Sequence, residues 1–136
     1  MGVDQSSEDW EDFKIRHEAA VGYAQAALKS LVLVNGGAIL SLLTFIGNAN
    51  SNVDKPLISY AFACFGLGLF SALIAHGAAY WAQEGYLNAA VARAENRESS
   101  DGNSKGDKGV FWGLIAAILS GLGFLAGAFL ALDAIL

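Results

Sequence analysis

Residues 31–40 read LVLVNGGAIL, and the Asn35-Gly36-Gly37 inside them decides between two folds. Asn-Gly between apolar runs is a strong short-range signal for a hairpin turn. Here, however, the apolar sequence extends over residues 29–48, which is the roughly 20 residues that a helix needs to cross a bilayer. A turn in lipid would leave backbone groups without hydrogen-bond partners, at a cost of several kcal/mol each. We therefore predict a continuous helix, in which the glycines allow close approach of another helix.

The composition is that of a membrane protein. Hydrophobic residues make up 54% of the 136 residues, charged residues only 15%, and the mean hydropathy is +0.43. Soluble domains carry about 25% charged residues. The charges gather in residues 4–18 and 84–108 and leave three long apolar stretches. The sequence therefore predicts an all-α integral membrane protein with three transmembrane helices, at residues 29–48, 57–82 and 110–136.

Four polar segments complete the predicted organisation. Residues 1–28 form an acidic cytoplasmic helix continuous with the first span, and residues 49–56 form a short loop on the outer side. Residues 83–97 keep helical composition and extend the second span into the cytoplasm. Residues 98–109 are rich in Gly, Ser and Asp, which is typical of a flexible linker. The first two helices are thus expected to extend into the cytoplasm as a helical hairpin.

The distribution of basic residues predicts the orientation. On the side of the membrane that holds the connection between the first two predicted spans, Lys55 is the one basic residue. Seven basic residues lie on the other: Lys14, Arg16, Lys29, Arg93, Arg97, Lys105 and Lys108. The positive-inside rule places the N-terminus in the cytoplasm and the C-terminus on the periplasmic or extracellular side. We expect a multi-pass protein of the cell inner (plasma) membrane.

The N-terminal helix carries a regular apolar pattern. Its spacing alternates between three and four residues, through Trp10, Phe13, His17, Ala20, Ala24, Ala27, Leu31 and Val34. A seven-residue repeat of this kind favours packing against another helix.

Ion pairs are predicted between the two cytoplasmic extensions. If Lys29 and Gln83 mark the same membrane level, Glu18 falls near Arg93. The same alignment brings Arg97 near Glu11 or Asp12. Exposed pairs contribute at most about 1 kcal/mol each, so they would align the extensions rather than hold them together. Two independently solvated charged faces are the alternative.

The same alignment places Asn35 and His76 at one depth, in the inner third of the bilayer. Because polar side chains at that depth need partners, we predict an Asn35–His76 contact, direct or through water. A structural hydrogen bond is the simpler interpretation, and proton sensing by His76 is the functional one.

Small and weakly polar residues mark the faces of the spans. One stripe on the first span consists of Gly37, Ser41, Thr44 and Asn48. It is either a pore-lining face in an oligomer or a packing face on which Ser and Thr bond their own backbone. In the third span, the predicted helix-packing residues are Gly113, Ala117, Gly121, Gly123 and Gly127.

The sequence shows no catalytic pattern. His17 and His76 are the only histidines, and no zinc-protease, phosphate-loop or nucleophile-elbow motif occurs. We therefore expect neither enzymatic activity nor a cofactor or metal, and the lack of clustered Lys and Arg argues against nucleic-acid binding.

The favoured function is a scaffold or accessory subunit of a membrane complex that acts through helix–helix assembly. Its expected partners are the lipid bilayer, further copies of itself or other membrane subunits, and a basic protein at the acidic N-terminus. The alternative is an oligomeric ion channel or pore-forming membrane effector lined by the first span.

Overall fold

The chain forms three long helices. The computed structural model describes the backbone of residues 5–48 and 54–136, and their side chains from Lys14 onward except those of Arg16 and His17. These residues form α1 (Gln5–Asn48), α2 (Lys55–Ala94) and α3 (Ser100–Asp133). Each contains a stretch long and apolar enough to cross a membrane, which confirms the predicted all-helical fold with three candidate spans.

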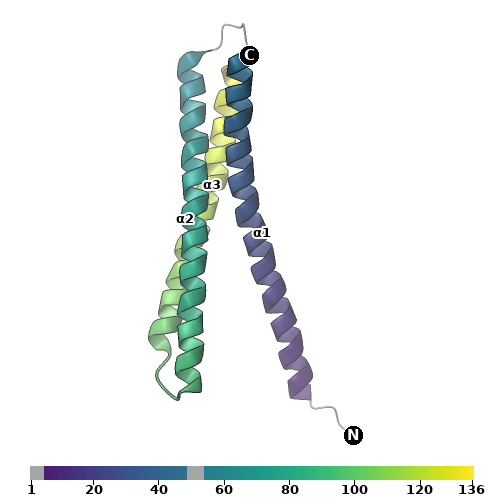
Figure 1. Ribbon diagram of the computed structural model, residues 1–136, viewed down its shortest axis with the longest axis vertical. Helices are drawn as coiled ribbons and strands as arrows, with labels where there is room; N and C mark the ends of the chain where they lie inside the picture. Colours follow the sequence, from purple (N-terminus) through teal and green to yellow (C-terminus); the bar gives the residue numbers. More distant parts are fainter. Residues whose placement is uncertain (1–4, 49–53) are drawn as a thin grey trace.

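α2 and α3 pack against each other along their lengths, whereas α1 packs on them over only part of its length. Figure 1 shows α2 and α3 side by side and antiparallel, whereas α1 lies beside them in its C-terminal half and diverges toward its N-terminus. The predicted cytoplasmic hairpin of the first two helices is therefore not confirmed. The helix that accompanies the C-terminal end of α2 is α3.

α1 continues through the Asn-Gly-Gly sequence. It is one helix of 44 residues, about 66 Å long at 1.5 Å per residue. This agrees with the expectation that the apolar residues on both sides of Asn35 would keep the backbone helical. The expected close approach at Gly36 and Gly37 is not found among the described residues, because a Cβ atom on either glycine would meet nothing within 4 Å.

α2 begins with a side-chain cap. The Oδ1 atom of Asp54 accepts a hydrogen bond from the backbone N–H of Leu57 at 3.1 Å. Pro56 stands in the first turn, where its missing N–H leaves no hydrogen bond unmade. Together these residues stop the helix from extending backward.

α2 ends in a Schellman motif. Asn96 adopts the left-handed conformation, with φ of 54°. The N–H of Arg97 then donates to the carbonyl of Ala92 at 2.8 Å, and the N–H of Asn96 donates to that of Arg93 at 3.1 Å. Because only residues 95–99 connect the two helices, α3 must turn back directly along α2.

The segment predicted as a flexible linker, residues 98–109, differs from that prediction. α3 begins at Ser100, so nearly the whole segment is helical. Glycine in a helix costs about 1 kcal/mol relative to alanine, and this is why the sequence alone favoured a linker.

Tertiary packing explains the helical glycines. Gly102, Gly106 and Gly109 follow one another at spacings of four and three and point at α2. A Cβ atom on Gly102 would lie 2.7 Å from the backbone N of Ala89, and one on Gly109 would lie 2.8 Å from that of Ala82. Only glycine permits this backbone approach, and the packing offsets its low helix propensity.

The same alternation continues along the entire interface. The buried residues of α2 are Ile58, Ala61, Phe65, Gly68, Ala72, Ala75, Ala82, Gly85, Ala89 and Ala92. Those of α3 are Gly106, Gly109, Ala116, Ser120 and Gly127. Spacings of three, four and seven residues, filled mostly by small residues, give an antiparallel pair with closely apposed backbones.

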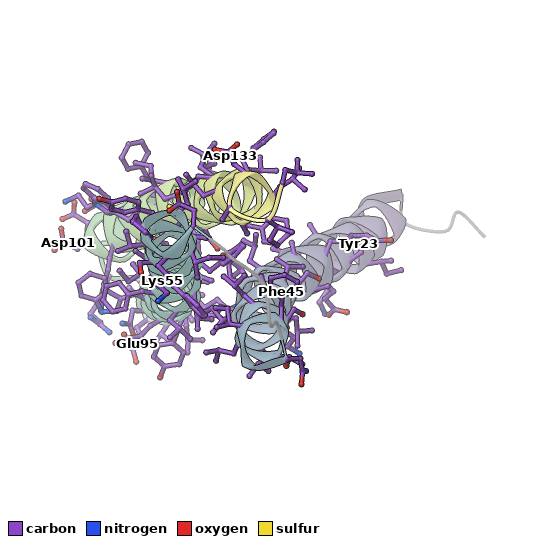
Figure 2. All side chains as sticks on the ribbon, turned by 90° about the horizontal axis from the view of Figure 1, so that it is seen from above. Tyr23, Phe45, Lys55, Glu95, Asp101 and Asp133 are labelled. Atoms are coloured by element: carbon purple, nitrogen blue, oxygen red, sulfur yellow. The ribbon has the colours of Figure 1, made fainter. Side chains whose placement is uncertain are left out.

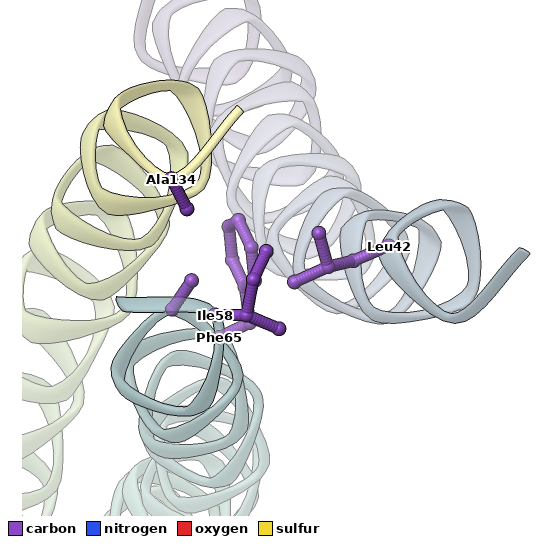
Figure 3. Packing of buried hydrophobic residues seen from close by; sticks show 5 residues of the cluster. Leu42, Ile58, Phe65 and Ala134 are labelled. Carbon is purple, nitrogen blue, oxygen red and sulfur yellow. The ribbon is translucent and has the colours of Figure 1, made fainter. Parts of the chain in front are cut away.

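α1 joins this pair near its C-terminal end. Figure 3 shows Leu42 of α1 beside Ile58 and Phe65 of α2 and Ala134, which follows α3. The carbonyl of Ala134 also accepts a hydrogen bond from the N–H of Asp54 at 3.3 Å. This cluster fixes the end of the bundle at which all three helices meet.

Candidate functional site

Two fully buried polar side chains, those of Asn35 and Ser120, lie side by side between the helices. Asn35 of α1 and Ser120 of α3 have no exposed surface. The Nδ2 group of Asn35 donates to the carbonyl of Leu31 at 2.9 Å. It also donates to the Oγ of Ser120 at 3.2 Å, with the Ser120 carbonyl 3.5 Å away. The amide therefore links α1 to α3 by using both of its hydrogens.

The oxygen of the same amide, Oδ1 of Asn35, has no hydrogen-bond partner among the described residues. The Oδ1 of Asn35 is buried and accepts no hydrogen bond. It occupies the place of a side chain on α2, since a Cβ atom on Gly68 would lie 2.2 Å from it. We call Asn35, Gly68 and Ser120 the Asn35 node. Glycine at residue 68 is what makes room for the amide between α2 and α3.

The Asn35 node replaces the predicted Asn35–His76 contact, which is wrong. The Nδ1 atom of His76 lies 3.0 Å from the carbonyl of Ala72 in its own helix. Gly68, the α2 residue opposite Asn35, precedes His76 by eight residues, about two helical turns. The prediction failed because it set Lys29 level with Gln83, and the packing of α1 does not follow that alignment.

The predicted Glu18–Arg93 pair does not form between these two described side chains. Glu18 is exposed, and the Nε of Arg93 donates to the carbonyl of Ala89 at 3.2 Å. The reason is the divergence of α1 from α2, which separates the two helices at this end (Figure 1).

Arg97 has a partner close in sequence. Its guanidinium forms an ion pair with Glu95. The predicted partners Glu11 and Asp12 lie outside the described side chains. The guanidinium of Arg97 therefore pairs with a carboxylate of the same short loop, whereas the prediction paired it with α1.

Polar contacts instead connect α2 with the first turns of α3. The ammonium of Lys105 lies 3.3 Å from a carboxylate oxygen of Glu84 and 5.7 Å from the centre of the Trp81 ring. The hydroxyl of Tyr86 donates to Asp107 at 2.8 Å. This hydrogen bond, then burial and the nearby negative charge, raise the pKa of Tyr86 above its ordinary value of 10.0.

The stripe of Gly37, Ser41, Thr44 and Asn48 is exposed along α1. Thr44 Oγ1 donates to the carbonyl of Leu40 at 2.9 Å, and Asn48 Nδ2 donates to that of Thr44 at 3.0 Å. These two side chains are thus satisfied by their own helix. Ser41, Thr44 and Asn48 of the stripe, together with Leu40 and Phe45, line a shallow open groove that α2 and α3 do not cover.

The small residues predicted for packing divide into two groups. A Cβ atom on Gly123 or Gly127 would lie within 3 Å of α2, and one on Gly113 would make ordinary contact. Ala117 and Gly121 are half-buried, and a Cβ atom on Gly121 would meet nothing within 4 Å.

Sequence reasoning missed two residues of this face, Ala116 and Ser120. It followed rows of every fourth residue, which drift around a helix of 3.6 residues per turn. An alternation of three and four, through Gly113, Ala116, Ser120, Gly123 and Gly127, would have found both.

Comparison of the chain with protein-family models, curated proteins and solved structures found no match. Among the described residues, no group of three or more His, Cys, Asp or Glu side chains could hold a metal ion.

Proposed function

We propose that this protein is a non-catalytic integral membrane protein that acts by helix–helix assembly, as a scaffold or accessory subunit of a membrane complex. The observation that carries the proposal is the uncovered stripe of Gly37, Ser41, Thr44 and Asn48 on α1. In lipid, small and weakly polar residues are typical of helix contacts. Since α2 and α3 leave this face free, another chain is the natural partner for it.

Aromatic side chains support the membrane placement. Tyr80, Trp81 and Trp112 are exposed near one end of the apolar part of the α2–α3 pair, and Tyr60 is exposed near the other end of that part. Such residues favour the two water–lipid boundaries. About 21 residues separate Tyr60 from Trp81, or about 32 Å, which matches the hydrocarbon thickness of a bilayer.

Asn35 then lies near the middle of the bilayer. The Asn35 node includes Gly68, which stands roughly midway between Asp54 and Trp81 on α2. A polar group at this depth orients a helix, because every alternative position would expose the amide to hydrocarbon. In this proposal the Asn35 node fixes α1 on the α2–α3 pair and thereby aims the uncovered stripe at the partner.

The proposed orientation keeps the N-terminus in the cytoplasm, in the inner (plasma) membrane. Lys105, Lys108 and Arg93 lie toward the end of the α2–α3 pair that carries Trp81, which is the end the positive-inside rule assigns to the cytoplasm. The acidic start of α1 would then offer a docking segment to a basic protein. Labelling of single cysteines introduced at Ser104 and Ser59 of a Cys64→Ser chain, with a membrane-impermeant thiol reagent in intact cells, tests this arrangement. Labelling of residue 59 alone is expected, and the reverse pattern would invert the topology.

The assembly itself is tested by extraction in mild detergent. The mass of the complex and the proteins that co-purify with it are measured for the native chain and for Ser41→Leu. We expect a complex larger than one chain, reduced by the leucine because it blocks close approach at the stripe. A monomer without co-purifying proteins would refute the proposal.

The second candidate is an oligomeric channel lined by α1. The exposure of Ser41 and Thr44 favours it, since the same stripe could face water at the centre of a ring. A liposome flux assay separates the two functions. Ion flux that Thr44→Leu abolishes would favour the channel, while a well-assembled complex without flux would favour the scaffold.

A further inference from the structure

Polar side chains share one face of α1 on the N-terminal side of Asn35. Glu18, Gln25 and Lys29 are all exposed. Their spacings of seven and four residues keep them within about 40° of one another around the helix, and about 100° away from Asn35. Figure 2 shows that this part of α1, where Tyr23 is labelled, extends away from α2 and α3. The described helices therefore leave the face uncovered.

The Asn35 node sets the depth of this face in the proposed membrane. Asn35 contacts Gly68, which precedes Trp81 at the inner boundary by 13 residues, or about 20 Å. Lys29 lies six residues from Asn35 on the antiparallel α1, a distance of only about 9 Å. Its Cα atom therefore lies about 10 Å inside the boundary. Lys29 is also the one charged residue within residues 19–47.

An ammonium group at this depth needs an anion, because an isolated charge in hydrocarbon is costly. The ion pairs between described side chains are Arg97 with Glu95 and Lys105 with Glu84, so Lys29 has no carboxylate partner among them. Helix side chains lean toward the N-terminus, and the long stem of Lys29 therefore carries its ammonium toward the cytoplasmic boundary. The anions at that boundary are the phosphates of the inner-leaflet lipids.

We propose that Glu18, Gln25 and Lys29 form a binding site for the phosphoethanolamine headgroup of an inner-leaflet lipid. The site rests on the membrane placement of the proposed function and adds a lipid of stated chemistry to the partners. Lys29 and the amide of Gln25, which lies about 6 Å nearer the cytoplasm, donate hydrogen bonds to the phosphate. The carboxylate of Glu18, about 10 Å further along the helix, accepts hydrogen bonds from the lipid ammonium.

The order of charges along the face selects ethanolamine among the common headgroups. In such a lipid the phosphate lies nearer the hydrocarbon and the ammonium nearer the water, which matches the order of Lys29 and Glu18. Choline carries the same positive charge, but its methyl groups leave no N–H to donate to Glu18. A glycerol headgroup supplies no cation, and the net charge of −5 on the chain opposes a net anionic lipid.

Lipid competition followed by native mass spectrometry tests the site. The full-length chain in mild detergent is mixed with equal amounts of phosphatidylethanolamine, phosphatidylcholine and phosphatidylglycerol that carry identical acyl chains. The ratio of the three is measured for the first lipid bound. We expect phosphatidylethanolamine to be held about two- to fivefold more tightly than phosphatidylcholine, the effect of one ion pair. Equal binding of these two, or tighter binding of phosphatidylglycerol, would overturn the inference.

Single substitutions assign the preference to its residues. Lys29→Gln should lower the binding of all three lipids by about two- to fivefold. Glu18→Gln should remove the preference for phosphatidylethanolamine and leave the binding of phosphatidylcholine unchanged. If Glu18→Gln keeps the native preference, the assignment of the ammonium to this carboxylate is wrong.

Lys14→Gln is the matched control for Lys29→Gln. It makes the same change at an exposed lysine of the same helix, 15 residues or about 22 Å nearer the N-terminus. Lipid binding like that of the native chain is expected. An equal loss in Lys14→Gln and Lys29→Gln would mean that total charge governs the binding, and this would refute a site at Lys29.

The same spectra separate the lipid site from the proposed assembly, because they also give the number of chains and any co-purifying protein. A larger complex without a lipid preference would overturn the lipid site and leave the scaffold function intact. A monomer that prefers phosphatidylethanolamine would support the lipid site and refute the assembly.

Discussion

Adding one methyl group to Gly109 should force α2 and α3 apart. A Cβ atom there would lie 2.8 Å from the backbone N and the Cβ of Ala82, and 2.9 Å from the carbonyl oxygen of Ala78. Two of these atoms belong to the backbone and cannot rotate away. Overpacking of this kind costs about 1–3 kcal/mol. It opposes the gain in helix propensity of up to about 1 kcal/mol that Gly→Ala brings in a helix interior.

Gly121→Ala is the matched control for Gly109→Ala. It makes the same change in the same helix, where the new methyl group would meet nothing within 4 Å. Because the propensity gain is common to both, we expect Gly109→Ala to be less stable than Gly121→Ala by about 1–3 kcal/mol. Both are unfolded in mild detergent by increasing amounts of SDS, with helicity followed by circular dichroism. Equal stability, or a more stable Gly109→Ala, would refute the argument that backbone contact at the glycines holds α3 on α2.

Three further predictions concern the Asn35 node and the connection between α2 and α3. Gly68→Ala would set a Cβ atom 2.2 Å from Asn35 Oδ1, so it should destabilise the bundle, and adding Asn35→Ala should relieve that loss of stability. A double-mutant cycle of the two substitutions should give a coupling free energy of about 0.5–3 kcal/mol, and additive effects would contradict the contact. The raised pKa of Tyr86 means that its contact with Asp107 stabilises the fold below the ordinary pKa of 10.0 and is lost as the pH rises through the raised value. The stability difference between the native chain and Tyr86→Phe should therefore shrink in alkali, and a difference that grows there would show that the sign is wrong. Asn96→Gly should be neutral or stabilising and Asn96→Ala destabilising by about 1 kcal/mol, because Asn96 has a φ of 54°; equal thermal midpoints for the two variants would count against the left-handed cap.

The extent of α1 and the start of α2 were predictable because they depend on local patterns, whereas the start of α3 was not. A long apolar run around Asn35 makes a helix whatever it packs against, and Pro56, two residues after Asp54, marks the start of α2. The end of α2 depends on Asn96, which adopts the left-handed conformation that Asn tolerates at a helix C-terminus. The Asn35 node was partly predictable, since a buried amide must find a partner, whereas the identity of that partner was not.

By itself, the sequence determined three helices, each long and apolar enough to cross a membrane, because hydropathy and backbone hydrogen bonding act within one segment. The tertiary structure decided which faces meet. It made a helix of the glycines after residue 98, because backbone contact with α2 offsets their low propensity. It paired Asn35 with Ser120 instead of His76, because Gly68 alone leaves space for the amide. Pairing depends on side-chain volumes at facing positions of separate helices, and a pattern read along one chain does not contain the alignment between them.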